Sequence, residues 1–213
     1  DNIVSKSIGD FDGIAISAPG AVTKSGIIEG LSAIPYIHGP NLIELIESRT
    51  NLKVSIENDA NCAGLAEVWL GSAKECQDAI FIVCGSGIGG AIIKNKHIHH
   101  GIHNFGGEFG FGLMEIDADN FEVGSIFSGT ASTQSLVRNV GKRKNRKNLD
   151  GYQVFDMADN GDEVAINEIN KFYFRLAVGI YNLQYFFDPE MIVVGGGISA
   201  RRDLVDRINE QLE

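Results

Sequence analysis

The sequence predicts an α/β protein, and its 213 residues suit one large domain or two small lobes. Short runs of β-branched and apolar residues alternate with longer segments whose apolar residues recur at helical spacing, which is the pattern of α/β folds. Apolar residues make up 44% of the chain and charged residues 22%, so we expect a packed core.

The predicted strands are short and end at turn residues. Strands are predicted at 12–18, 53–56, 79–84, 91–94 and 191–194, and a hairpin at 22–30. The first and last of these strands are expected to be buried, because they are almost continuously apolar. Pro19-Gly20 ends the first strand, and Asn95-Lys96 forms a turn after the fourth.

Helical spacing defines the remaining elements. Helices are predicted at 42–46, 59–70, 131–140, 152–158, 163–187 and 200–212. Asn41 is a candidate N-cap of the first helix, and Gly71 is placed to end the second. The helix at 163–187 carries an apolar stripe that we assign to the core: Ile166, Ile169, Tyr173, Leu176, Ile180, Leu183 and Phe187. Segment 117–130 yields no prediction.

Residues 57–61, Glu-Asn-Asp-Ala-Asn, stand where a predicted strand passes into a predicted helix. The helix N-terminus favours a negative charge there, so Asp59 is expected to be a carboxylate at the carboxyl end of a strand. A group at that position can act on a ligand in the cleft outside the sheet. The alternative is that Asp59 only caps the helix, which is the commoner role for such a residue.

Two glycine-rich segments follow predicted strands. Gly85, Gly87 and Gly90 match G-x-G-x-x-G, but β-branched and small residues follow them instead of a helix. This predicts a hairpin with a glycine tip and argues against nicotinamide or flavin binding. Such a tip can hold phosphates on its backbone amides, the alternative being a plain tight turn. The second segment, 195–197, is all glycine and could border a nucleoside.

The bulk composition excludes several classes of function. The formal charge is −10, from 18 basic and 28 acidic residues, so the chain is not built to hold nucleic acid. The basic run at 142–147 is expected to be a solvated loop after a helix. No apolar run reaches the roughly 20 residues that span a bilayer, and no signal peptide is recognisable. Cys62, Cys76 and Cys84 lack metal spacing and suit buried thiols, so we expect a cytoplasmic protein.

Five motifs in order resemble the ROK family, a name that covers repressors, open reading frames and sugar kinases. They are Ser-Ala-Pro-Gly (17–20), Glu-Asn-Asp-Ala-Asn (57–61), Gly-Ser-Gly-Ile-Gly-Gly (85–90), Gly-Gly-Glu-Phe-Gly (106–110) and Val-Gly-Gly-Gly (194–197). The resemblance implies an actin-like ATPase (ribonuclease H-like) fold of two lobes around a cleft. It places a small N-terminal lobe at 1–75 and a large C-terminal lobe at 76–213, both incomplete.

The resemblance also implies a function and a set of site residues. ROK kinases transfer the γ-phosphate of ATP to a hydroxyl of a hexose, amino sugar or β-glucoside, with Mg²⁺ as cofactor. By resemblance Asp59 is the catalytic base, and Asn58 and Glu108 bind sugar hydroxyls. The ATP-binding residues would be Gly85, Ser86, Gly87 and Gly89 at the phosphates, and Gly195, Gly196 and Gly197 at the adenosine. A homodimer is expected. The alternative is a sugar-sensing transcriptional regulator of the same family without catalytic activity.

The chain departs from the family pattern in three places. The opening Asp-x-Gly-Gly-Thr hairpin is absent from this sequence, and 127–130 lacks the sugar-binding acid that members often carry. The cysteine run that binds zinc is also absent, and Phe111 replaces its partner histidine, so no structural zinc is expected. We expect Phe111 to contact the anomeric end of the sugar, the alternative being that it only fills the space left by the absent zinc site. A metal site formed by His97, His99, His100 and His103 is the alternative to plain exposed polarity.

Overall fold

The computed structural model describes residues 11–213 except 31, 33 and 116–124. The main sheet has the order β7-β6-β5-β8. Its strands are β5 (Ala79–Cys84), β6 (Ile88–Lys94), β7 (His97–Ile98) and β8 (Met191–Gly195). β5 runs antiparallel to β6 and parallel to β8, so β5 and β8 end at the same edge of the sheet.

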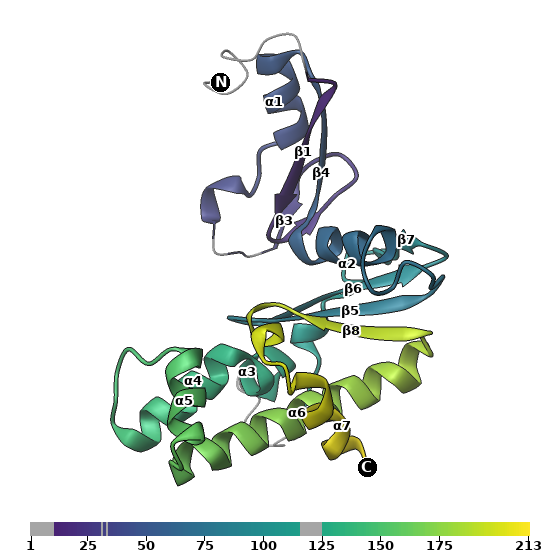
Figure 1. Cartoon of the computed structure of the whole chain (residues 1–213). Coiled ribbons are helices and arrows are strands. Elements are labelled where there is room, and N and C mark those ends of the chain that lie inside the picture. The colour runs from purple at the N-terminus through teal and green to yellow at the C-terminus, as the bar shows by residue number, and fades with distance from the viewer. Residues whose placement is uncertain (1–10, 31, 33, 116–124) are drawn as a thin grey trace.

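Helices cover both faces of this sheet (Figure 1). On one face lies α2 (Asp59–Trp69), which packs on β5 and β6. The other face carries α3 (Phe127–Ala131), α4 (Thr133–Lys144), α5 (Gly151–Asp159), α6 (Glu163–Phe187) and α7 (Leu204–Leu212). The short 3₁₀ helices η3 (Phe109–Phe111) and η5 (Gly197–Ala200) follow β7 and β8 in the chain.

The first part of the chain forms a smaller unit on the α2 side of the sheet (Figure 1). β1 (Gly13–Ala18) pairs in parallel with β4 (Lys53–Asn58), and β2 (Ala21–Val22) pairs with β3 (Ile28–Glu29) to form the predicted hairpin. The 3₁₀ helix η2 (Pro35–Ile37) and α1 (Leu42–Thr50) complete this unit. Asn41 caps α1 as predicted, because its side chain accepts the backbone N–H of Glu44.

The main core lies between the sheet and helices α3 to α7. Ile80 and Ile82 of β5 pack there with Phe172, Tyr173 and Leu176 of α6. A second, smaller apolar cluster lies beneath α2. Gly64 allows that helix to approach the sheet closely, because a Cβ at this position would stand 2.7 Å from the Cβ of Ala91. The division into lobes at residue 75 stays a prediction. Since α2 packs on the main sheet, we propose a boundary between Asn58 and Asp59.

Several predicted elements differ from the structure. The strands at 12–18 and 191–194 are less buried than predicted: β1 alternates between exposed and half-buried residues and is buried at Ala18, and every residue of β8 is half-buried. The reason is pairing, because each has a single neighbouring strand among the described residues. α6 has its predicted bounds, but its stripe leaves the core at both ends, where Ile166 is 37% and Phe187 42% exposed.

The helix predicted at 131–140 is also shifted. Ser132 caps it, and it continues as α4 to Lys144, so the basic run begins inside the helix rather than after it. Cations are favoured in a last helical turn by the partial negative charge of the free carbonyls, which explains the extension. The helix predicted at 200–212 begins at Leu204, after η5. Among the described residues, no helix is long and apolar enough to cross a membrane.

Candidate active site

The parallel pairing of β1 and β4 brings two of the motifs together. Ala18 is the register partner of Asn58, so the turn after β1 and the start of α2 lie at one edge of the small sheet. The Nδ2 of Asn58 donates a hydrogen bond to the backbone oxygen of Gly20, at 3.1 Å. The carboxyl ends of parallel strands are where ligands bind in α/β proteins.

Asn58, rather than Asp59, supplies the side-chain cap of α2. Its Oδ1 accepts the backbone N–H groups of Ala60 at 2.9 Å and Asn61 at 3.1 Å. Asp59 is the first helical residue and is exposed, and its Oδ1 shares the N–H of Ala60 at 2.9 Å. The helix therefore does not depend on Asp59 for its start, and this carboxylate is free to face a ligand.

Glu108 belongs to the same site as Asp59. It precedes η3 and is half-buried, and burial first and the charge of Asp59 second raise the pKa of its carboxyl group. Glu108 and Asn58 line one small cavity, although 50 residues separate them in the sequence. The remaining lining residues come from the turn after β1, from β2, β4 and β6, from the start of α2 and from the segment after β7: Gly20, Ala21, Val22, Glu57, Asn61, Gly90, His100, Asn104 and Gly106.

The glycine hairpin connects β5 to β6, as predicted, and lies beside the start of α2. The backbone N–H of Gly85 donates to the oxygen of Gly87, at 2.9 Å, across the exposed Ser86. A Cβ on Gly89 would stand 3.5 Å from the Cβ of Ala60, the residue after Asp59. The hairpin is thus next to the candidate base, and a Cβ on Gly85 would meet no atom within 4 Å.

The second glycine segment meets the first at the ends of β5 and β8. Gly195 pairs with Val83, and Gly196 has a φ of 88°, which side chains rarely adopt. A Cβ on Gly196 would also stand 2.6 Å from the backbone oxygen of Cys84, whereas one on Gly197 would meet no atom within 4 Å. The two elements that the resemblance assigns to phosphates and adenosine are therefore neighbours, and the backbone at Gly85 and Gly197 is open.

Three hydrogen bonds at this site were not predicted. Ser128, in the segment without a prediction, accepts the backbone N–H of Ile88 at 2.8 Å and so fixes the base of the glycine hairpin. Glu57 bonds Asn61 at 2.9 Å and His100 at 2.8 Å. Glu57 and Asn61 stand in the Glu-Asn-Asp-Ala-Asn motif and His100 in the histidine cluster, but the sequence contains no signal that these segments meet.

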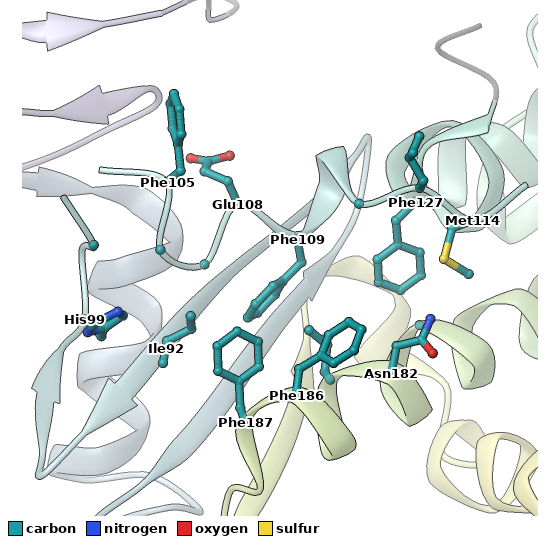
Figure 2. Close-up of a pocket in the computed structure, with 17 residues that line it drawn as sticks. Ile92, His99, Phe105, Glu108, Phe109, Met114, Phe127, Asn182, Phe186 and Phe187 are labelled. Carbon is teal, nitrogen blue, oxygen red and sulfur yellow. The ribbon is translucent and has the colours of Figure 1, made fainter. Parts of the chain in front are cut away.

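Phe111 lies on η3 and is 72% exposed. It does not line the cavity shared by Asn58 and Glu108, so its contact with a sugar stays a prediction. Residues on both sides of η3 also line an apolar cavity of about 550 Å³. The ring centroids of Phe109 and Phe187, which line it, lie 6.1 Å apart. Figure 2 shows the carboxyl group of Glu108 pointing away from these rings.

The histidines and cysteines show no shared metal geometry among the described residues, where no group of three or more His, Cys, Asp or Glu could hold an ion. The Nδ1 of His97 faces the backbone oxygen of Asn95 within its own turn. Cys76 and Cys84 are buried as predicted, and burial raises the pKa of the Cys84 thiol to about 11. Cys62, on α2, is only half-buried, unlike the prediction.

Fold and site together define an α/β protein of the actin-like ATPase class, with its candidate base beside a glycine hairpin. The sequence model of the ROK family matches residues 2–213, and the chain belongs to that family. A β-glucoside kinase from Listeria innocua is 37% identical over 207 residues, which cover 95% of this chain and 70% of the relative.

Two solved structures extend the comparison. A ROK family protein from Streptococcus pneumoniae TIGR4 in complex with sucrose is 38% identical, with a TM-score of 0.88 over 96% of this chain and 69% of the other. A ROK family glucokinase from Streptomyces griseus in complex with glucose and AMPPNP is 26% identical, with a TM-score of 0.77 over 95% of this chain and 71% of the other.

Proposed function

We propose that this chain transfers the γ-phosphate of ATP to a hydroxyl group of a hexose or β-glucoside, with Asp59 as the base. The chain is a ROK-family sugar kinase, an ATP-dependent phosphotransferase, like its relatives from Listeria and Streptomyces. The observation that carries the proposal is the contact between the glycine hairpin and the start of α2. This proximity supports a phosphate loop beside Asp59, whose charge in turn acts on Glu108.

The sugar side of the reaction depends on alignment. Phosphoryl transfer has a loose transition state, so holding the attacking hydroxyl in line matters more than removing its proton early. Asp59 would orient that hydroxyl and accept its proton late in the step. Asn58 uses its Oδ1 and one N–H within the protein and has a second N–H to donate to a sugar oxygen. Glu108 would accept hydroxyl hydrogens from the other side of the cavity.

The nucleotide side depends on backbone groups. Gly85, Ser86, Gly87 and Gly89 would present amide hydrogens to the phosphates, and Gly195, Gly196 and Gly197 would border the adenosine. Bound Mg²⁺ would neutralise the phosphate oxygens during transfer. Closure of the two units would exclude water, which otherwise competes with the sugar as acceptor.

The exposed ring of Phe111 favours substrates that are substituted at C1. A phenyl ring forms no hydrogen bond with a free anomeric hydroxyl, but it can stack on a second sugar ring or an aglycone. The 72% exposure of Phe111 supports this contact over a role as a filler of the space left by the absent zinc site. The names of two relatives agree, since one is a β-glucoside kinase and the other holds sucrose, a glucoside.

The test is an ADP-release assay of the full-length protein over a panel of sugars. We expect kcat/KM for methyl β-glucoside to equal that for glucose within about 10-fold, because an apolar wall discriminates weakly. Phe111→His restores a hydrogen-bonding group and should shift the preference towards glucose. A glycoside worse by more than about 100-fold would refute the C1 proposal. Sugar binding without ADP release for any sugar would instead indicate the regulator.

A further inference from the structure

We infer that Glu57 is a positioning residue, whose bond to His100 ties the segment bearing Glu108 to the junction bearing Asp59. This inference rests on the proposed function, because it concerns how the two carboxyl groups of that site are held together. The segment is residues 99–108, which follow β7 and lie on the main sheet, whereas Glu57 belongs to β4 of the small unit.

Glu57 is bonded on both of its oxygens. Oε1 accepts the backbone N–H of Asn58 at 2.8 Å and the Nδ2 of Asn61 at 2.9 Å. Oε2 lies 2.8 Å from the Nε2 of His100. All three partners can donate a hydrogen bond, and an ionised carboxylate only accepts them. The bond to Glu57 requires that the ring hydrogen of His100 lies on Nε2. The two side chains are 25% and 36% exposed, so solvent only partly competes for the bond.

His100 is linked in turn to the residues just before Glu108. Its backbone oxygen accepts the N–H of Gly106 at 2.8 Å. A Cβ on Gly106 would overlap the backbone of His99, so the segment folds back closely on itself. Gly107 then packs on the sheet, where its Cβ would stand 2.6 Å from the backbone oxygen of Gly90. The position of Glu108 is therefore coupled to His100 through a tight loop of fixed backbone.

Glu57 also holds the other half of the site. Asn58 caps α2, and Asn61 lies in the first turn of that helix, on either side of Asp59 in the sequence. One side chain thus bonds Asn58 and Asn61, which flank the candidate base in the sequence, and also His100, the anchor of the sugar-binding segment. Losing the bond to His100 should loosen Glu108 relative to Asp59 without touching the glycine hairpin, so sugar binding should weaken and ATP binding should not.

The first test compares variants of His100 in the full-length protein. We expect His100→Leu to raise the KM and Kd for sugar by about 10-fold, the value of one charge-assisted hydrogen bond. The KM for ATP should stay within about 2-fold of the wild-type value, since the substitution does not touch the glycine hairpin. His100→Gln, whose amide can donate to Glu57, should recover most of the affinity. His97→Leu is the matched control, because the side chain of His97 bonds Asn95 within its own turn and no other partner among the described residues.

An unchanged sugar KM in His100→Leu, or an equal rise in both KM values, would overturn the inference. Glu57→Leu should weaken sugar binding at least as much, but it also removes the acceptor of Asn58 and Asn61, so the His100 variants carry the test.

The second test needs no substrate and so separates the inference from the proposed function. Backbone amides in 99–108, including that of Gly106, should exchange hydrogen faster in His100→Leu than in the wild type or in His97→Leu. If the wild type phosphorylates no sugar but the exchange changes as expected, the tie exists and the proposed function is wrong. If exchange in this segment is unchanged, the positioning role is wrong even in an active kinase.

Discussion

Asp59 lies close enough to Glu108 that its negative charge adds to burial in raising the pKa of the Glu108 carboxyl group. The two acids have different surroundings, because Asp59 is exposed at the start of α2 and Glu108 is half-buried before η3. Pairs of acids whose environments differ in this way are a common arrangement for separate roles in one site. Here the exposed group suits proton transfer and the half-buried group suits binding.

Sugar affinity should fall as the solution becomes acidic. Only the ionised form of Glu108 accepts hydrogen bonds on both carboxyl oxygens. The pKa of Glu108 is raised, so it takes up a proton at a higher pH than an ordinary glutamate, whose pKa is 4.5. In Asp59→Asn, burial still raises the pKa of Glu108, but the charge of Asp59 no longer does. The pH at which sugar affinity falls should therefore move lower. Calorimetric measurement of sugar binding as a function of pH, in the wild type and in Asp59→Asn, tests both expectations. A pH profile that is the same in the two proteins would show that the two carboxyl groups are not coupled.

Asp59→Asn should lower turnover by about 100-fold or more, because the general base is lost. Sugar binding and fold should be kept, since Asn58 supplies the cap of α2 and the substitution preserves shape. Steady-state kinetics with a binding measurement check this, and thermal unfolding is the control for the fold. Turnover at the wild-type rate would mean that Asp59 has no part in the chemistry.

Gly87→Val should weaken ATP use much more than sugar binding. A branched side chain at the tip of the hairpin would push the phosphates away from the backbone amides. Losing one such charge-assisted bond should raise the KM for ATP about 10- to 100-fold. Gly87→Ala is the matched smaller change, because its Cβ would make only an ordinary contact, 3.4 Å from Ser128. Equal loss of both affinities would indicate a structural turn instead of a phosphate loop.

Gly179→Ala should destabilise the main core without altering the site directly. A Cβ at this position in α6 would overlap the ring of Phe127, which is only 3% exposed. Overpacking of this kind costs about 1–3 kcal/mol of unfolding free energy. Asn167→Ala, on the exposed side of the same helix, should change stability by less than about 0.5 kcal/mol. Denaturant unfolding measures the free energy of unfolding of both variants. A value for Gly179→Ala equal to that of the wild type would mean that Phe127 repacks freely.

The local elements could be predicted because their signals are local. The bounds of α6, the hairpin of β2 and β3, the cap at Asn41 and the glycine tip between β5 and β6 all follow from spacing, turn residues and capping residues within a few positions. The capping role that was the alternative for Asp59 belongs to Asn58, one residue earlier, a difference that spacing alone does not resolve. Burial was predicted less well, as β1 shows, because it depends on neighbours that a strand's own residues do not specify.

The sequence by itself therefore determined the order of elements, the family and the residue types at the junctions of strands and helices. Only the tertiary structure decided which junctions meet. Glu57 reaches His100 across 43 residues, Ser128 holds Ile88 across 40, and Gly196 packs on Cys84 at the end of a neighbouring strand. Periodicity and caps act over a few residues, whereas these contacts arise from the pairing of parallel strands and the packing of distant segments on one sheet. No local pattern records that geometry.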